Sequence, residues 1–320
     1  MDKSLRLSYI DWAKVICILL MISCHAGQKG LILDMTYQFH MPLFFIISGM
    51  LFRPKGIIME LKQFGFPIFF FGIVNMIYRI SKHMLGGASL VASNEIMSES
   101  FKSLLLPSSI SWFQGYWFVI TLLLMRILMN NNLVNRFKVS ICLMCIIWSS
   151  IEPFFLIPDY ITSFKPYHII SCFPFFITGM LLKDKNINII KGTFECKCII
   201  MFVFIILTFI QGRVDLCYYQ YGFNYLILFT NALLGSYIIL NLVSVFPTRK
   251  YIQSLSTGTF LILGLHGLMY GYINKGIQML SINNPYTPFL TGLIVCVLLL
   301  PIIQILEKYC PIVLGKSRKI

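Results

Sequence analysis

The chain has 320 residues, of which 58% are hydrophobic and 12% charged, and its mean hydropathy is +0.80. This composition excludes an ordinary soluble domain, and long apolar runs in a bilayer satisfy their backbone groups as helices, so we predict a polytopic all-α membrane protein. The net charge of +14 is scattered between apolar blocks, which argues against a nucleic-acid-binding domain.

Apolar blocks separated by polar, Pro or Gly residues predict about ten transmembrane helices in a single domain over residues 1–320. The blocks do not alternate polar and apolar residues, so they do not resemble barrel strands. In chain order they are 9–27, 37–53, 64–80, 112–129, 139–156, 168–183, 197–212, 223–245, 258–275 and 288–308.

Basic residues are unevenly divided between the two sides of the membrane. With a cytoplasmic N-terminus, 18 Lys and Arg residues fall in inner segments and 7 in outer ones, with Lys14 inside the first span. The positive-inside rule therefore predicts a multi-pass protein of the cell membrane with both termini cytoplasmic. The longest outer connection, 81–111, is either an acceptor-binding lid or a plain solvated linker.

The ten cysteines do not indicate a metal site or a disulfide framework. Most lie in apolar stretches, where a small side chain packs well. Cys142 with Cys145, and Cys196 with Cys198, lack the second pair that a zinc site requires. We therefore expect no bound metal and no resident cofactor.

Three ionisable residues in the first span are the first candidates for function, because intramembrane charges are costly. Lys14 and His25 share a helix face and lie roughly 16 Å apart along the axis. Asp11 lies one turn before Lys14 and is expected to pair with it. The alternative is that Asp11 and Lys14 snorkel at the inner interface while His25 caps the outer end.

The second span has His40 near its outer end, and the topology puts His40 at the membrane depth of His25. An imidazole suits general base chemistry at physiological pH, whereas two imidazoles without a third ligand do not make a metal site. Ser48 and Gly49 are small and predict close helix packing rather than a nucleophile.

These segments resemble the membrane-bound acyltransferase 3 family, particularly its sugar O-acetyltransferase branch. The specific element is a basic residue and a histidine with ten residues between them, which Lys14 and His25 match, followed by the stretch 39–49. Weaker similarities follow at 115–118, 175–182 and 256–266.

The resemblance implies a ten-helix enzyme that takes an acyl group from cytoplasmic acetyl-CoA, or another acyl-CoA, and places it on an acceptor outside the membrane. Where the family often has paired arginines before the third span, this chain has Arg53, Lys55 and Lys62, which we expect to hold the CoA phosphates. Trp117 and His266 are expected in the pocket, although a belt tryptophan and a structural histidine would look the same. We expect no soluble hydrolase-like domain of the kind that some members carry after the last span.

The sequence therefore predicts an integral membrane O-acyltransferase that modifies a sugar or polysaccharide, with acyl-CoA, the sugar and membrane lipids as its partners. His25 would be the general base, Lys14 and Asp11 would seat the donor, and His40 would orient His25 or stabilise the oxyanion. A transporter or flippase of a sugar or lipid-linked precursor is the main alternative, although the polar residues do not recur in matching halves. A non-catalytic scaffold would not need Lys14 and His25 on one face.

Overall fold

A computed structural model describes residues 8–85, 117–155, 167–184, 192–280 and 284–316 of the chain. These residues form helices, together with one isolated bridge between Asp215 and Gln220. The all-α prediction is confirmed. Most of the connection 81–111 lies outside the described residues.

Every predicted span overlaps a helix. The helices are α1 (Ser8–His25), α2 (Leu31–Met50), α3 (Ile57–Glu60), the π-helix η1 (Leu61–Gly65), α4 (Phe66–Leu85), α6 (Trp117–Met129), α7 (Asn132–Arg136), α8 (Lys138–Ile151), α10 (His168–Asp184), α11 (Phe194–Gln211), α12 (Tyr225–Val243), α13 (Lys250–Thr257), α14 (Thr259–Met279) and α15 (Thr287–Tyr309). Short 3₁₀ turns, η3 (Glu152–Phe154), η5 (Leu216–Tyr218) and η6 (Pro311–Leu314), complete the set.

The number of membrane crossings is not confirmed at ten. By length and composition, six helical segments of the described chain can cross a membrane: α1, α2, Ile57–Lys82, α11, α12 and α15. The pair α13 and α14 makes a seventh if it counts as one span bent by 78°. The described helices α6, α8 and α10 are shorter, and an apolar helix of about 20 residues is what a bilayer core requires.

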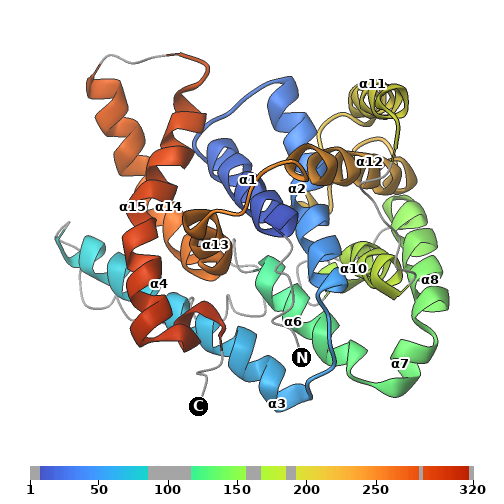
Figure 1. Ribbon diagram of the computed structural model, residues 1–320, viewed down its shortest axis with the longest axis horizontal. Helices are drawn as coiled ribbons and strands as arrows, with labels where there is room; N and C mark the ends of the chain where they lie inside the picture. Colours follow the sequence, from blue (N-terminus) through green and yellow to red (C-terminus); the bar gives the residue numbers. More distant parts are fainter. Residues whose placement is uncertain (1–7, 86–116, 156–166, 185–191, 281–283, 317–320) are drawn as a thin grey trace.

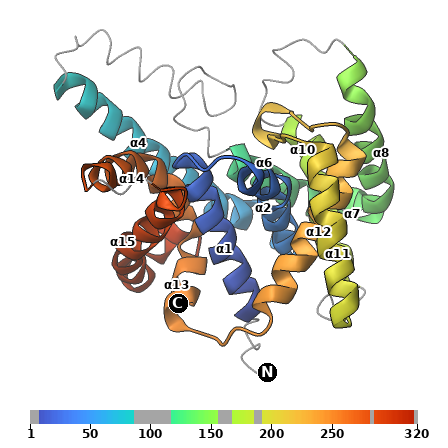
Figure 2. The ribbon, with the colours of Figure 1, turned by 90° about the horizontal axis from the view of Figure 1, so that it is seen from above.

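Helices α1 and α2 lie at the centre of the bundle (Figures 1 and 2). On one side α1 packs against α13, α14 and α15, and α4 packs against α14. On the other side α2 packs against α10 and α12, with α8 and α11 beyond them. The two helices that carry the predicted catalytic residues therefore have neighbours from the whole length of the chain.

The contact between α2 and α10 depends on two glycines. A Cβ atom at Gly49 would overlap the carbonyl oxygen of Phe176, and a Cβ atom at Gly179 would overlap the carbonyl oxygen of Ile46. Because neither residue has a side chain, the two backbones touch, as small residues allow in membrane bundles. The predicted packing role of Gly49 is confirmed, whereas Ser48 lines a pocket.

Candidate active site

His25 is the last residue of α1, and the turn that follows fixes its position. Gly27 has a φ of +107°, a conformation that glycine adopts without a steric penalty and that ends the helix. Asn274 of α14 donates its Nδ2 hydrogen to the carbonyl oxygen of Ala26 at 2.9 Å. Thr291 of α15 in turn donates to Asn274 Oδ1 at 2.5 Å. The end of α1 is thus tied to α14 and α15.

Three histidines line one pocket of about 450 Å³, which we call the histidine pocket: His25, His40 and His266. The ring of His25 lies 5.4 Å from that of His266, centroid to centroid. His40 and His266 are buried, whereas His25 is exposed within the pocket. The described residues contain no group of three His, Cys, Asp or Glu side chains that could hold a metal ion.

Backbone carbonyls select one tautomer of the two buried histidines. His40 Nδ1 lies 2.6 Å from the carbonyl oxygen of Thr36, and His266 Nδ1 lies 3.0 Å from those of Ile262 and Leu263. Because a carbonyl oxygen can only accept, each Nδ1 carries the hydrogen. The Nε2 atom of each neutral ring therefore has a lone pair and can accept a proton or a hydrogen bond.

Two further polar groups of the histidine pocket are also acceptors. Asn75 of α4 donates both Nδ2 hydrogens, to the carbonyl oxygens of Phe71 and Gly264 at 2.9 Å each, so its remaining polar atom is Oδ1. Asp215, in the connection between α11 and α12, supplies a carboxylate. Burial raises the pKa of Asp215, although hydrogen bonds from the backbone of Cys217 and Tyr218 and the charge of Arg213 oppose this rise.

Trp117 also lines the histidine pocket, at the first residue of α6. Its ring lies 4.9 Å from that of His168, whose Nε2 is 3.1 Å from the carbonyl oxygen of Cys217. Tyr219 Oη lies 2.8 Å from His168 Nδ1, so His168 donates to Cys217 and accepts from Tyr219. This buried histidine connects Trp117 to the connection that carries Asp215.

A second pocket, of about 870 Å³, lies at the other end of α1, and we call it the basic pocket. Its described lining contains the acidic Asp11 and five basic side chains, namely Lys14, Arg53, Lys55, Arg126 and Lys316. Both Asp11 and Lys14 face this pocket, and the ion pair between them stays a prediction. Lys62 is exposed and does not belong to this lining.

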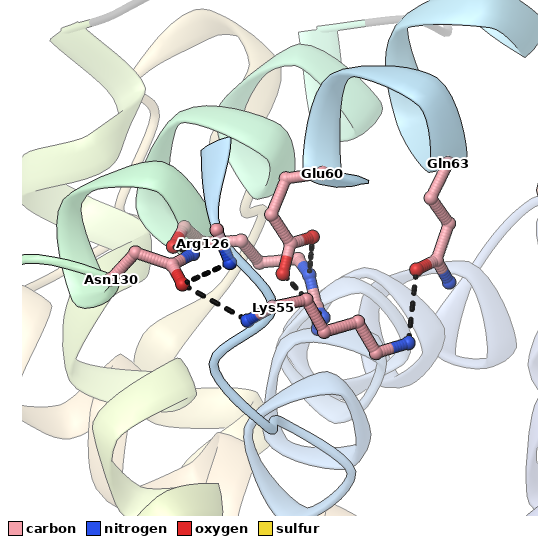
Figure 3. Close-up of polar contacts among 6 residues, drawn as sticks. Lys55, Glu60, Gln63, Arg126 and Asn130 are labelled. Carbon is pink, nitrogen blue, oxygen red and sulfur yellow. Dashed lines mark hydrogen bonds and ion pairs between the residues drawn. The ribbon is translucent and has the colours of Figure 1, made fainter. Parts of the chain in front are cut away.

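Arg126 of α6 forms a buried ion pair with Glu60 of α3 (Figure 3). Arg126 Nε and Nη2 donate to the two carboxylate oxygens at 2.7 and 3.1 Å. The guanidinium carbon also lies 5.0 Å from the ring centroid of Phe52 and 4.9 Å from that of Phe64, within cation–π range. Bidentate pairing and two aromatic faces fix this cation at the wall of the basic pocket.

The connection between α2 and α3 carries Arg53 and Lys55, and polar contacts hold its backbone. Asn130 Oδ1 accepts from the backbone N–H groups of Lys55 and Gly56 at 3.1 and 3.0 Å (Figure 3). Lys183 Nζ donates to the carbonyl oxygen of Phe52 at 2.5 Å. The side chains of Arg53 and Lys55 thus extend from a fixed backbone into the pocket.

The structure brings most of the predicted residues together in two groups. His25, His40, Trp117 and His266 line the histidine pocket, and Lys14, Asp11, Arg53 and Lys55 line the basic pocket. Their contacts with substrates stay predictions.

Among the residues that sequence reasoning missed, Asn75 and Asp215 line the histidine pocket and His168 packs against its Trp117. Arg126 lines the basic pocket, and Glu60 pairs with Arg126. Arg126 and Glu60 could have been recognised from the sequence, because ionisable residues in or beside a membrane span usually have a functional or structural role. The other three are recognisable only through their neighbours in space.

Comparison with known families gives one match that spans most of the chain. The acyltransferase 3 family model, described as an acyltransferase domain, matches residues 7–308. No curated protein and no solved structure matches the chain. The matched range includes α1 to α14 and nearly all of α15, so the chain belongs to the acyltransferase 3 family and is a membrane acyltransferase.

Proposed function

We propose that this acyltransferase moves an acyl group, most simply acetyl, from cytoplasmic acyl-CoA to a hydroxyl of a sugar outside the membrane. One observation carries the proposal: Lys14 and His25 share a face of α1, yet line the basic and the histidine pocket respectively. A helix with a cation at one end and a base at the other suits two substrates that approach from opposite sides.

The basic pocket supports an anionic donor. CoA carries its phosphates at one end and its thioester at the end of a long thin arm. Lys14, Arg53 and Lys55 bring positive charge to the pocket from α1 and from the α2–α3 connection. Lysine binds phosphate as a point charge, and the single Arg53 adds bidentate geometry.

The histidine pocket supports an acceptor rich in hydroxyl groups. Its fixed polar atoms, Asn75 Oδ1 and the Nε2 atoms of His40 and His266, accept hydrogen bonds, and a sugar hydroxyl can donate one. Trp117 and Tyr37 add aromatic surface to the lining, against which the apolar face of a sugar ring packs. Matching donors to acceptors in this way also discriminates against ligands that lack hydroxyl groups.

In the proposed reaction His25 removes the proton from the acceptor hydroxyl as its oxygen attacks the thioester carbonyl carbon. A carbon–oxygen bond forms and the carbon–sulfur bond breaks, so CoA leaves as a thiolate. The imidazolium of His25 then returns the proton to the sulfur, giving the sugar ester and free CoA thiol. Asp11 and Lys14 seat the donor. His40 orients His25, because the Nε2 atom of its neutral ring is an acceptor and cannot donate a hydrogen bond to the developing oxyanion.

The test combines a cellular and a purified assay. Deletion of the gene, followed by mass spectrometry of the cell-surface glycans, should remove an acyl mass increment from one glycan. Complementation with the wild type should restore it and complementation with His25→Ala should not. Purified protein in nanodiscs should release free CoA from acetyl-CoA only when that glycan is present. Unchanged glycans in the deletion strain together with no acceptor-dependent CoA release would contradict the proposal.

A further inference from the structure

Four helices, α1, α2, α6 and α14, each contribute residues to both pockets. On α2, Met41 lines the histidine pocket and Phe44 the basic pocket, and on α6 the neighbours Trp117 and Phe118 divide in the same way. Helices α1 and α14 also contribute to both linings. The two pockets are therefore stacked along the bundle, with a thin layer of side chains between them.

Among the described residues, Leu263 of α14 is the one side chain that lines both pockets. It is 7% exposed, and two further residues of the basic pocket, Phe44 and Phe118, have their ring centroids 5.6 Å apart. On α1, the fully buried Ile18 lies between Lys14 and Met21 on the same helix face. We call these four residues, Ile18, Phe44, Phe118 and Leu263, the septum.

The septum stands on the path that the proposed reaction requires. The phosphates of the donor stay in the basic pocket, while the thioester has to reach His25 in the histidine pocket. The acyl group is the leading end of the arm, so it passes the septum first. A change of the Leu263 rotamer would open such a path at a lower cost in free energy than the movement of a helix, because side-chain rotamers at a cavity interconvert quickly.

We propose that Leu263 determines donor specificity, because its side chain limits the size of the acyl group that passes from the basic pocket to the histidine pocket. The inference rests on the proposed acyl-CoA donor. It predicts that short acyl groups are transferred and longer ones are rejected at the septum, although both bind through the same CoA phosphates. Discrimination in an apolar passage amounts to about 10–200-fold per methylene group.

The first experiment measures transfer from acetyl-, butyryl- and hexanoyl-CoA in nanodiscs. Leu263→Ala should raise kcat/KM for hexanoyl-CoA relative to acetyl-CoA by about tenfold or more, and Leu263→Val should raise it less. The matched control is Leu261→Ala, which removes the same atoms from a buried residue of α14 that lines neither pocket. If Leu263→Ala, Leu263→Val and Leu261→Ala all keep the wild-type ratio, the inference is wrong.

The second experiment follows passage without turnover. In a background from which the ten native cysteines have been removed, Met21→Cys places a thiol in the histidine pocket. CoA added with a mild oxidant should form a mixed disulfide with this cysteine, detected as a mass increase of the intact protein. Adding Leu263→Trp should slow capture about tenfold or more, while Leu261→Phe should not. Equal capture with and without Leu263→Trp would overturn the inference.

The two experiments separate this inference from the proposed function. Absence of transfer from every acyl-CoA by the wild type, together with no capture of CoA at Met21→Cys, would contradict the proposed donor itself. Acyl transfer and CoA capture that stay the same when Leu263 is substituted would contradict only the role of this residue.

Discussion

The imidazole of His266 on α14 lies 5.4 Å from that of His25 at the end of α1, and its Nδ1 hydrogen is committed to two carbonyl oxygens of its own helix. The Nε2 atom of His266 is therefore available only as an acceptor while the ring is neutral. A general base usually needs a second group that orients it, as the carboxylate does in a catalytic triad.

We expect His25→Ala to lower acyl transfer by about 10²–10⁴-fold while the protein stays folded, because a positioned general base contributes this much. If His266 acts through His25, the double variant His25→Ala, His266→Ala should be about as slow as His25→Ala alone, since residues that act as a unit are not additive. Initial rates of CoA release in nanodiscs measure both effects. If the fold loss in rate of the double variant equals the product of the two single losses, His266 acts independently of His25.

Lys14 and His25 should give different kinetic signatures, because they line different pockets. Lys14→Gln should weaken acyl-CoA binding, measured by calorimetry, whereas His25→Gln should lower kcat and leave donor binding nearly unchanged. Lys250→Gln is the matched control, since it removes a charge from an exposed lysine outside the pocket lining. Normal donor binding by Lys14→Gln with lost turnover would assign Lys14 to the chemical step instead.

Removing one partner of the buried Glu60–Arg126 ion pair should lower the free energy of unfolding strongly. Glu60→Gln leaves the guanidinium of Arg126 buried without its countercharge, which typically lowers the free energy of unfolding by about 3–5 kcal/mol. Replacing both residues by Met should cost less, because no buried charge then remains. Denaturant unfolding in detergent micelles measures both variants.

The control for that measurement is the exposed pair of Lys138 and Asp184, whose charged atoms are 2.7 Å apart and whose side chains are 17% and 46% exposed. Removing this pair with Asp184→Asn should cost no more than about 1 kcal/mol. A loss as large as that of Glu60→Gln would show that burial does not decide the stability of these pairs.

Gly49→Ala should destabilise the protein, because the added methyl group would overlap the carbonyl oxygen of Phe176 and force α2 away from α10. Overpacking of this kind costs about 1–3 kcal/mol. Gly276→Ala is the control, since nothing lies within 4 Å of its added Cβ atom and alanine favours the helix. A thermal unfolding midpoint that falls equally in both variants, or in neither, would rule out this close contact.

The predicted topology puts the turn after α1 outside and the start of α13 inside. With an impermeant maleimide added to intact cells, a cysteine introduced at Lys29 should therefore react and one introduced at Arg249 should not, although both positions are exposed. Solubilised protein, in which both positions should react, serves as the control. Labelling of both positions in intact cells would overturn the topology and the outer placement of His25.

The sequence by itself determined what depends on local spacing and composition. Apolar blocks of sufficient length specify helices wherever the backbone has no water to bond, and each predicted block overlaps a helix. The spacing of Lys14 and His25 puts both on one face of α1, because the helical period is a property of the chain alone.

Only the tertiary structure decided which distant residues join them. Trp117 and His266 each had a structural interpretation as well, and packing of α2, α6 and α14 around α1 put them, together with His40, at one pocket with His25. Arg126 counted only as an inner positive charge until α3 brought Glu60 to within hydrogen-bond distance of it. In the sequence, Leu263 is one of many apolar residues of its helix. Its position between the two pockets depends on how the helices pack, because a cavity wall consists of side chains that are far apart in the sequence.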